Sequence, residues 1–135
     1  MANKYHAKKC RCSHGCKHDS RMEARRCETL HQLEQAGKIA CLAVHPKYVL
    51  LEPLQLPWRK EKAVTYTADF AYTLPTGDRV VEDVKSDATR REREYILKRK
   101  LFEARFCRNG DAIFFENVGG NGRCAGCDSI GDKEE

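Results

Sequence analysis

The chain has 135 residues, 33% of them charged, and a formal net charge of +5 at pH 7. This length suits a single domain with one modest core, and no apolar run is long enough to span a membrane. The N-terminus carries basic residues without the apolar segment of a secretory signal, so we expect a cytoplasmic protein. Its eight cysteines are then expected to be metal ligands or core residues rather than a disulfide framework.

Residues 1–19 are polar, basic and rich in cysteine, and we predict a hairpin that turns at Ser13-His14-Gly15. The tail, residues 119–135, is rich in glycine and carries a second cysteine pair. Two such pairs suit a tetrahedral structural Zn²⁺ that ties both ends of the chain together, with free thiols as the alternative. The preferred ligands are Cys12, Cys16, Cys124 and Cys127, with Cys10 and His18 as alternates. Three further cysteines lie in apolar stretches and are predicted to be core residues, namely Cys27, Cys41 and Cys107.

A first helix is predicted to begin after Ser20 and to end near Gly37. Ser20 and Glu23 have the spacing of a capping box, in which the two side chains satisfy backbone N–H groups of the first turn. Glu23 also stands at the head of an apolar stripe that continues through Cys27 and Leu30. A lone carboxylate there is costly without a partner, so the spacing leaves open whether Glu23 caps the helix or joins a site.

The residue pattern in the middle of the chain predicts strands. The best candidates are residues 47–51, 64–72 and 79–85, which are rich in β-branched and aromatic residues. Residues 54–62 are predicted to be a loop. Proline and glycine in Leu74-Pro75-Thr76-Gly77-Asp78 predict a reversal, so the last two strands are expected to form a hairpin.

Each arm of this hairpin carries an acid. Asp69 lies in the first arm, and Asp83 lies two residues before Lys85 in the second. Because side chains alternate along a strand, Asp83 and Lys85 share a face and Glu82 lies on the other. Two carboxylates and an ammonium that converge in this way can hold Mg²⁺ or Mn²⁺ and a water beside a phosphate.

A second helix is predicted from about residue 89 to residue 106, and a last strand from residue 111 to residue 118. The apolar side of this helix is expected to consist of Leu97, Leu101 and Ala104. Its basic face could contact a DNA backbone. The residues singled out for that contact are Arg91, Lys98 and Arg99.

These features carry a resemblance to a known superfamily. An acid followed by an Asp-x-Lys triplet on the next strand resembles the PD-(D/E)xK nucleases, and the wider sequence resembles a small phage-encoded family assigned to them. The likeness covers roughly residues 3–118. The segments that carry it are Asn3-Lys4-Tyr5-His6-Ala7-Lys8-Lys9, Asp19-Ser20-Arg21-Met22-Glu23-Ala24-Arg25, Thr67-Ala68-Asp69-Phe70, Val81-Glu82-Asp83-Val84-Lys85 and Tyr95-Ile96-Leu97-Lys98-Arg99-Lys100-Leu101-Phe102.

The resemblance implies an α/β fold with a restriction-endonuclease-like core, in which helix, three strands, helix and strand build a mixed sheet flanked by helices. The core would span residues 20–118, between the cysteine-rich hairpin and the tail. It also implies a metal-dependent DNA endonuclease, possible Holliday-junction-resolvase-like action, a homodimer, and a location in the host cytoplasm if the protein is phage-encoded. The catalytic residues implied are Glu23, Asp69, Asp83 and Lys85, of which the three acids would hold Mg²⁺. The zinc ligands predicted above depart from the family pattern.

Two other functions stay open on the sequence alone. One is a non-catalytic, zinc-stabilised nucleic-acid-binding module in which the acids are structural. The other is an interaction protein that uses a nuclease fold without its chemistry. Mg²⁺-dependent cleavage would distinguish the nuclease from both of these alternatives.

Overall fold

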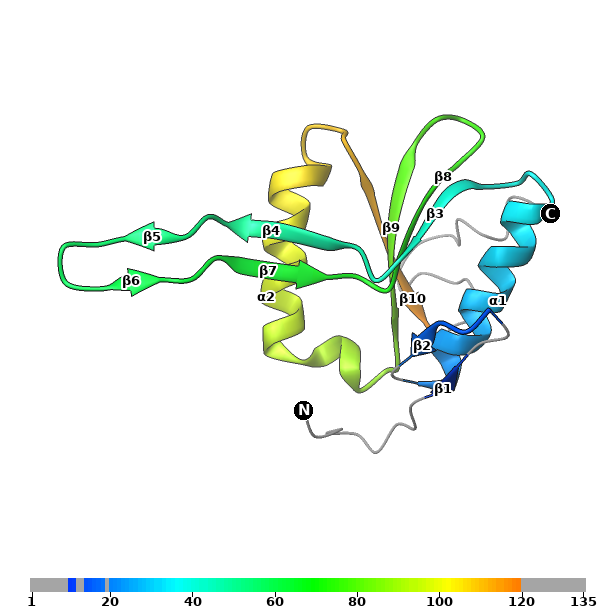
Figure 1. Cartoon of the computed structure of the whole chain (residues 1–135), viewed down its shortest axis with the longest axis horizontal. Helices are drawn as coiled ribbons and strands as arrows, with labels where there is room; N and C mark the ends of the chain where they lie inside the picture. Colours follow the sequence, from blue (N-terminus) through cyan, green and yellow to red (C-terminus); the bar gives the residue numbers. More distant parts are fainter. Residues whose placement is uncertain (1–9, 12–13, 19, 120–135) are drawn as a thin grey trace.

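A computed structural model describes residues 10–11, 14–18 and 20–119 of the chain (Figure 1). Its centre is a mixed four-stranded sheet in the order β10-β9-β8-β3, with antiparallel pairing except between β9 and β10. Helix α1 packs on one face of this sheet and helix α2 on the other. The protein is therefore a mixed α/β fold whose sheet is flanked by helices, as expected. The elements are α1 (Arg21–Gln35), β3 (Ala40–Val44), β8 (Phe70–Thr73), β9 (Arg79–Lys85), α2 (Arg93–Phe102) and β10 (Ile113–Val118).

A long two-stranded arm leaves the central sheet between β3 and β8 (Figure 1). Its base pairs β4 (Lys47–Leu51) with β7 (Val64–Thr67), and its tip pairs β5 (Leu54–Gln55) with β6 (Lys60–Glu61). Two predictions are corrected here. The strand at 47–51 belongs to the arm and not to the central sheet, and the predicted loop at 54–62 is the tip of a hairpin.

The predicted strand at 64–72 is divided into β7 and β8. The division falls at Ala68 and Asp69, where the chain passes from the arm into the central sheet. The predicted reversal at 74–78 is confirmed: β8 and β9 pair antiparallel, and Gly77 adopts a φ of 95°, which only glycine takes at low cost.

Helix α1 has the predicted limits. The Ser20 side chain accepts a hydrogen bond of 3.1 Å from the backbone N–H of Glu23, and Gly37 follows the helix with a φ of 75°. Cys27 and Leu30 are fully buried against the central sheet, as the apolar stripe predicted. Cys41, in contrast, is exposed, so its prediction as a core residue is wrong.

The two faces of β9 are sealed by different elements. Val80 and Val84 pack with Phe70 and Phe115 under α1, whereas Val81 packs with Phe102 under α2. Full burial of such side chains contributes about 1.5–3 kcal/mol each. The strand that carries the acid triplet is thus packed on both faces.

Glu82 lies on the α1 face of β9, opposite Asp83, as predicted. Its carboxylate accepts two hydrogen bonds from Arg26 of α1, at 2.7 and 3.0 Å. Tyr72 and Asn117 donate two more, at 2.7 and 2.8 Å. Glu82 is completely buried, so these four donors compensate the loss of water around its charge. This network holds α1 at a fixed place on the sheet.

The second helical region begins with a 3₁₀ turn, η1 (Thr89–Arg91), and closes with a π-helical turn, η2 (Glu103–Cys107). The predicted buried side of this helix is wrong: Leu97 and Leu101 are 59% and 41% exposed, and Ala104 is also exposed. Tyr95 and Phe102 face inward instead. They are seven residues apart, so they lie on one side of the helix, and Phe102 joins an aromatic cluster with Tyr48 and Tyr66.

The N-terminal hairpin forms as predicted in its backbone. Strands β1 (Cys10–Arg11) and β2 (Lys17–His18) pair antiparallel, with Cys10 opposite His18. The hairpin lies beside α1 (Figure 1). Among the described residues, no helix has the length and apolarity needed to cross a membrane.

Candidate functional site: an acidic cluster where the arm leaves the sheet

The arm and the central sheet diverge at two short chain segments that we call the fork: His45-Pro46 and Ala68-Asp69. Backbone hydrogen bonds join the two segments, from His45 N to Asp69 O at 2.9 Å and from Ala68 N to Pro46 O at 3.0 Å. The ladder between β8 and β9 ends at the Phe70–Glu82 pair, so within the described part of the chain the last residues of β9 have no strand partner on the β8 side. Side chains from the fork can therefore reach the end of β9.

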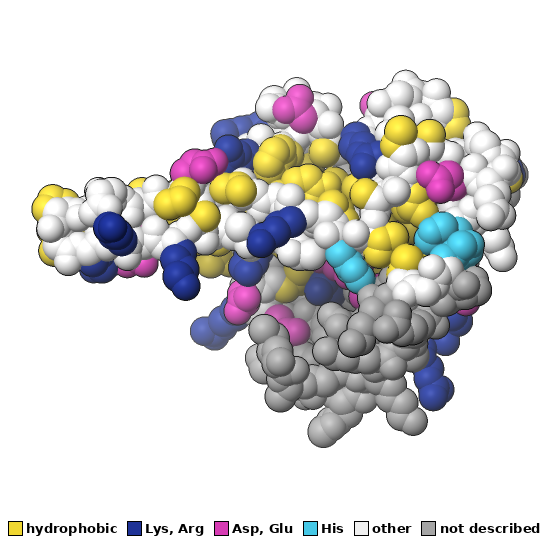
Figure 2. Space-filling view, viewed as in Figure 1, with side chains coloured by type: hydrophobic (Ala, Val, Ile, Leu, Met, Phe, Trp, Pro, Cys, Tyr) yellow, Lys and Arg dark blue, Asp and Glu magenta, His cyan; other side chains and the backbone are white. Residues whose placement is uncertain are grey.

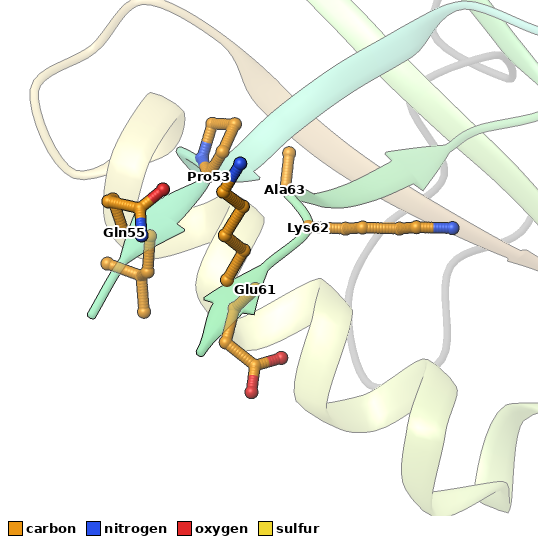
Figure 3. A pocket seen from close by; sticks show the side chains of 7 residues that line it. Pro53, Gln55, Glu61, Lys62 and Ala63 are labelled. Carbon is orange, nitrogen blue, oxygen red and sulfur yellow. The ribbon is translucent and has the colours of Figure 1, made fainter. Parts of the chain in front are cut away.

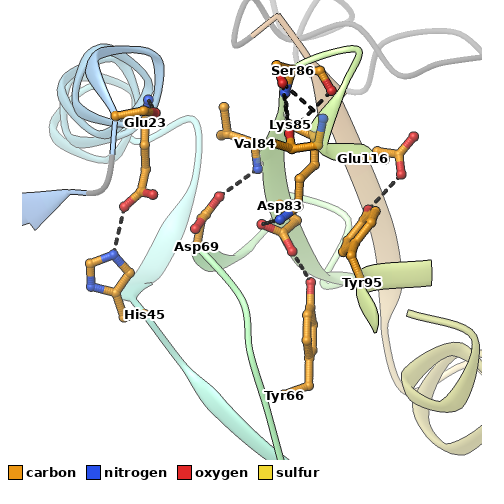
Figure 4. Close-up of polar contacts among 12 residues, drawn as sticks. Glu23, His45, Tyr66, Asp69, Asp83, Val84, Lys85, Ser86, Tyr95 and Glu116 are labelled. Atoms are coloured by element: carbon orange, nitrogen blue, oxygen red, sulfur yellow. Dashed lines mark hydrogen bonds and ion pairs between the residues drawn. The ribbon is translucent and has the colours of Figure 1, made fainter. Parts of the chain in front are cut away.

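The carboxylate of Asp69 lies beside the end of β9. Its Oδ2 accepts a hydrogen bond of 2.7 Å from the backbone N–H of Val84, where a ladder partner would otherwise stand (Figure 4). Burial raises the pKa of Asp69 well above its ordinary value, and the nearby charges of Asp83 and Glu23 raise it further. The surroundings of Asp69 thus favour its protonated form.

Asp83 lies next to Asp69 at the end of β9 (Figure 4). Tyr66 of the arm donates its hydroxyl proton to Asp83 Oδ2, and Lys85 Nζ lies 3.8 Å from Asp83 Oδ1. Burial raises the pKa of Asp83, although the ammonium of Lys85 acts in the opposite direction. Asp83 and Lys85 therefore share a face, as the strand alternation predicted.

Two residues of other elements complete this side of the site. The ammonium of Lys85 lies over the ring of Tyr95, 4.4 Å from its centroid. Tyr95 in turn donates a hydrogen bond of 2.6 Å to Glu116 Oε1. Glu116 stands opposite Asp83 in the parallel β9–β10 pair, so both side chains project to the same face.

Glu23 reaches the fork from the first turn of α1. Its Oε2 lies 2.7 Å from Nε2 of His45, and one ligand atom each from Glu23, His45 and Asp69 lie within 4.8 Å of one another. The backbone N–H of Glu23 is capped by Ser20, while the Glu23 side chain points to His45 and joins the acidic cluster. His45 has a φ of 57°, a left-handed conformation that is uncommon outside glycine and often stands at functional sites.

All four residues predicted for catalysis, namely Glu23, Asp69, Asp83 and Lys85, lie around the fork (Figure 4). Sequence reasoning missed His45, Tyr66, Tyr95 and Glu116. An acid inside the apolar strand Ile113-Phe114-Phe115-Glu116-Asn117-Val118 was a readable signal for Glu116. Nothing in the sequence marked His45, because its role depends on a turn between two strands.

The basic residues predicted for DNA contact are engaged in ion pairs on the surface of the second helical region. Arg91 lies 3.2 Å from Asp87, and Lys98 lies 3.4 Å from Glu94. Arg99 lies 3.0 Å from Glu103. The Arg91–Asp87 pair is exposed, and such pairs contribute about 0–1 kcal/mol, so a phosphate can compete for Arg91. The cations of Lys98 and Arg99 are half-buried.

Of the predicted zinc ligands, Cys12, Cys124 and Cys127 lie outside the described residues. Cys16 is half-buried and packs on the core beside α1. Its neighbours with ligand atoms are Cys27 and His31, both of α1. The predicted set of Cys12, Cys16, Cys124 and Cys127 therefore stays a prediction.

The arm carries a surface pocket. A pocket at its tip is lined by Pro53, Leu54, Gln55 and residues 60–63, and none of these belongs to the acidic cluster (Figure 3). Large apolar side chains are exposed along the arm, among them Val49 and Trp58, which is 72% exposed. Figure 2 shows basic side chains along the same arm.

Comparison with curated proteins and with solved structures finds no match. One family profile does match, over residues 2–115, and it covers the acidic cluster apart from Glu116. Since this match spans most of the chain, the protein belongs to the family described as "Protein of unknown function (DUF1064)".

Proposed function

We propose that this protein is a metal-dependent endonuclease that hydrolyses phosphodiester bonds of DNA, with the restriction-endonuclease-like core that its resemblance to PD-(D/E)xK nucleases implies. The observation that carries the proposal is the convergence of Asp69, Asp83 and Lys85 at the fork. The order α1, β3, β8, β9, α2, β10 also agrees with the helix, three strands, helix and strand of that core.

A divalent cation fits the chemistry of this site. Asp69 and Asp83 are adjacent carboxyl groups whose pKa values are raised chiefly by burial, so a cation beside them would favour the ionised forms that burial disfavours. These two residues would hold the ion, with Glu23 as a further oxygen ligand, and such ligands favour Mg²⁺ or Mn²⁺. The ion would polarise a phosphate and lower the pKa of a bound water.

The protein's own groups supply the rest. Lys85 is fixed between Asp83 and the ring of Tyr95, where its ammonium can stabilise negative charge on phosphoryl oxygens or orient the attacking water. Tyr66 holds Asp83 through its hydroxyl proton, so it is a positioning residue. His45 holds Glu23 in the same sense.

DNA would approach along the surface that carries α2 and the arm. Arg91, Lys98 and Arg99 would exchange their carboxylate partners for backbone phosphates. A homodimer, also implied by the resemblance, would place two acidic clusters on two strands of one substrate. The exposed Leu97 and Leu101 support an apolar contact of this kind.

The test is cleavage of a panel of labelled substrates, namely linear duplex, single strand, flap and four-way junction, with Mg²⁺, Mn²⁺ or a chelator. Asp69→Asn and Asp83→Asn keep the shape of each side chain and one of its two acceptor oxygens but remove the negative charge, and each is expected to lower cleavage at least about 100-fold while DNA binding persists. Asp111→Asn, at an exposed position, is the matched control and should cleave as the wild type does.

Two results would contradict the proposal. No substrate cleaved in either metal, by protein that binds DNA, would favour the non-catalytic binding module. Cleavage that survives in both Asp69→Asn and Asp83→Asn would place the chemistry elsewhere or in a contaminant.

A further inference from the structure

A second cluster of ligand side chains lies away from the fork, between the N-terminal hairpin and α1. Cys16, Cys27 and His31 each offer one donor atom, and these atoms lie within 4.8 Å of one another. Cys27 is completely buried, and the other two are half-buried. We infer that Cys16, Cys27 and His31 form a structural site for a soft divalent cation, of which Zn²⁺ is the best fit.

The helix supplies two of the ligands at the right spacing. Cys27 and His31 are four residues apart, so they project from the same side of α1 one turn from each other. Cys27 Sγ lies 3.5 Å from Nδ1 of His31. Two ligands on a tetrahedral zinc with normal Zn–S and Zn–N bonds are about 3.5 Å apart, so the pair already has the separation that the ion requires.

The hairpin supplies the third ligand. Cys16 follows Gly15, whose φ of 82° lets the chain turn back so that the next residue faces α1. Cys16 then packs against the same cluster as Cys27. Two cysteines and one imidazole prefer Zn²⁺ over the hard Mg²⁺ expected at the fork, so the two sites would not compete for one metal.

The imidazole of His31 is positioned by its neighbours. Its ring stacks on that of His14 at a centroid distance of 3.9 Å. Its Nδ1 also lies 2.9 Å from the backbone carbonyl of Cys27, and an ion bound at Nδ1 would take the place of this contact, with the ring proton on Nε2. The fourth position is left for water or a further side chain.

A metal here would connect the hairpin to the helix that carries Glu23. Cys27 is four residues after Glu23, so the ion would stiffen the turn that delivers this carboxylate to the fork. The described part of the hairpin pairs two strands of two residues each, and a metal offsets the entropy of ordering so small a unit.

The experiment measures zinc in the purified full-length chain by mass spectrometry and then replaces it with Co²⁺, whose thiolate charge-transfer and tetrahedral d–d bands report the ligands. We expect about one zinc per chain. Cys16→Ser and His31→Gln should each weaken zinc binding by more than the roughly 10–100-fold that loss of a supporting group costs, and should change the cobalt spectrum. Circular dichroism shows whether each variant is folded.

Two control variants locate the site. Cys41→Ser removes an exposed thiol, and Asp83→Asn alters the fork, and both should keep wild-type zinc content and spectrum. The inference is overturned if the wild type holds no zinc, or if folded Cys16→Ser and His31→Gln bind zinc as the wild type does. A joint Cys124→Ser and Cys127→Ser change that abolishes zinc while His31→Gln leaves it intact would assign the metal to the tail instead.

Discussion

Asp69 and Asp83 are two buried carboxyl groups that lie side by side. Burial raises the pKa of both, and the charge of Asp83 raises the pKa of Asp69 further, whereas the hydrogen bond with Asp69 lowers the pKa of Asp83. An acid with a higher pKa in the folded chain than in the unfolded chain binds its proton more tightly when folded. Its contribution to the free energy of unfolding therefore falls as the pH rises from the unfolded pKa, about 4, through the folded one.

This pH dependence predicts how a divalent cation would change the melting temperature. Protons and a divalent cation compete for the same carboxylates, so added Mn²⁺ should raise the melting temperature more at about pH 8 than at about pH 5. Asp83→Asn should remove most of this metal-dependent shift, while Asp111→Asn should keep it. A shift that is equal at both pH values would mean that the ion binds at groups other than the buried acids.

The role proposed for Lys85 can be tested separately from metal binding. Lys85→Met keeps much of the side-chain volume and removes the ammonium, so we expect cleavage to fall about 100- to 1,000-fold, the usual cost of losing one transition-state donor. Mn²⁺ affinity, measured by calorimetry, should be unchanged or higher because a nearby positive charge is gone. Lys62→Met on the exposed arm is the control. A parallel loss of metal affinity in Lys85→Met would show that the lysine supports the metal site rather than the reaction.

At the scale of elements, the site depends on how α1 sits on β9. Glu23 is on the helix and Asp83 is on the strand, and the buried Arg26–Glu82 pair lies between these two elements. Removal of one partner of a buried ion pair leaves the other charge without compensation and typically costs about 3–5 kcal/mol. The pair therefore fixes the geometry of the fork from the opposite face of the sheet.

Arg26→Met should lower the free energy of unfolding in urea by about 3–5 kcal/mol, because Glu82 then stays buried without its cation. The exposed Arg59–Glu61 pair provides the contrast, since Arg59→Met should cost less than about 1 kcal/mol. Equal effects of the two changes would mean that the buried pair is not a major contribution to the position of α1.

The sequence predicted the elements whose signal is local. Ser20 and Gly37 bounded α1, and strand alternation placed Asp83 and Lys85 on one face with Glu82 on the other. The buried side of the second helical region was predicted wrongly. Its leucines have helical spacing, but the larger Tyr95 and Phe102 are the side chains that are buried. The roles of His45 and Tyr66 could not be foreseen, since they depend on how the arm meets the sheet.

At the scale of the molecule, the protein is a compact body with a projecting arm (Figure 2). The arm tip exposes Trp58 together with the basic residues Arg59, Lys60 and Lys62. An exposed aromatic ring beside cations suits contact with nucleic acid, through stacking and phosphate binding. The tip also lies outside both apolar cores, so it contributes little to folding.

Replacement of residues 52–63 by Asn-Gly should therefore give a folded protein, because Leu51 and Val64 already pair and an Asn-Gly turn suits such a hairpin. DNA affinity should fall, and the slope of log K against log salt should decrease by about 0.9 for each phosphate that the arm neutralises in the wild type. Fluorescence anisotropy at several salt concentrations measures both. An unchanged slope would remove the arm from the DNA-binding surface.

The central claim is that the acids at the fork hold a divalent cation for phosphodiester hydrolysis. Crystals soaked in Mn²⁺ and measured at its absorption edge test this claim most directly. The account predicts an anomalous peak bound by carboxylate oxygens of Asp69 and Asp83, with Lys85 beside it, and no such peak in Asp83→Asn. A fork that stays without manganese, while Asp69 and Asp83 share a proton or bond only to Tyr66 and Lys85, would contradict it.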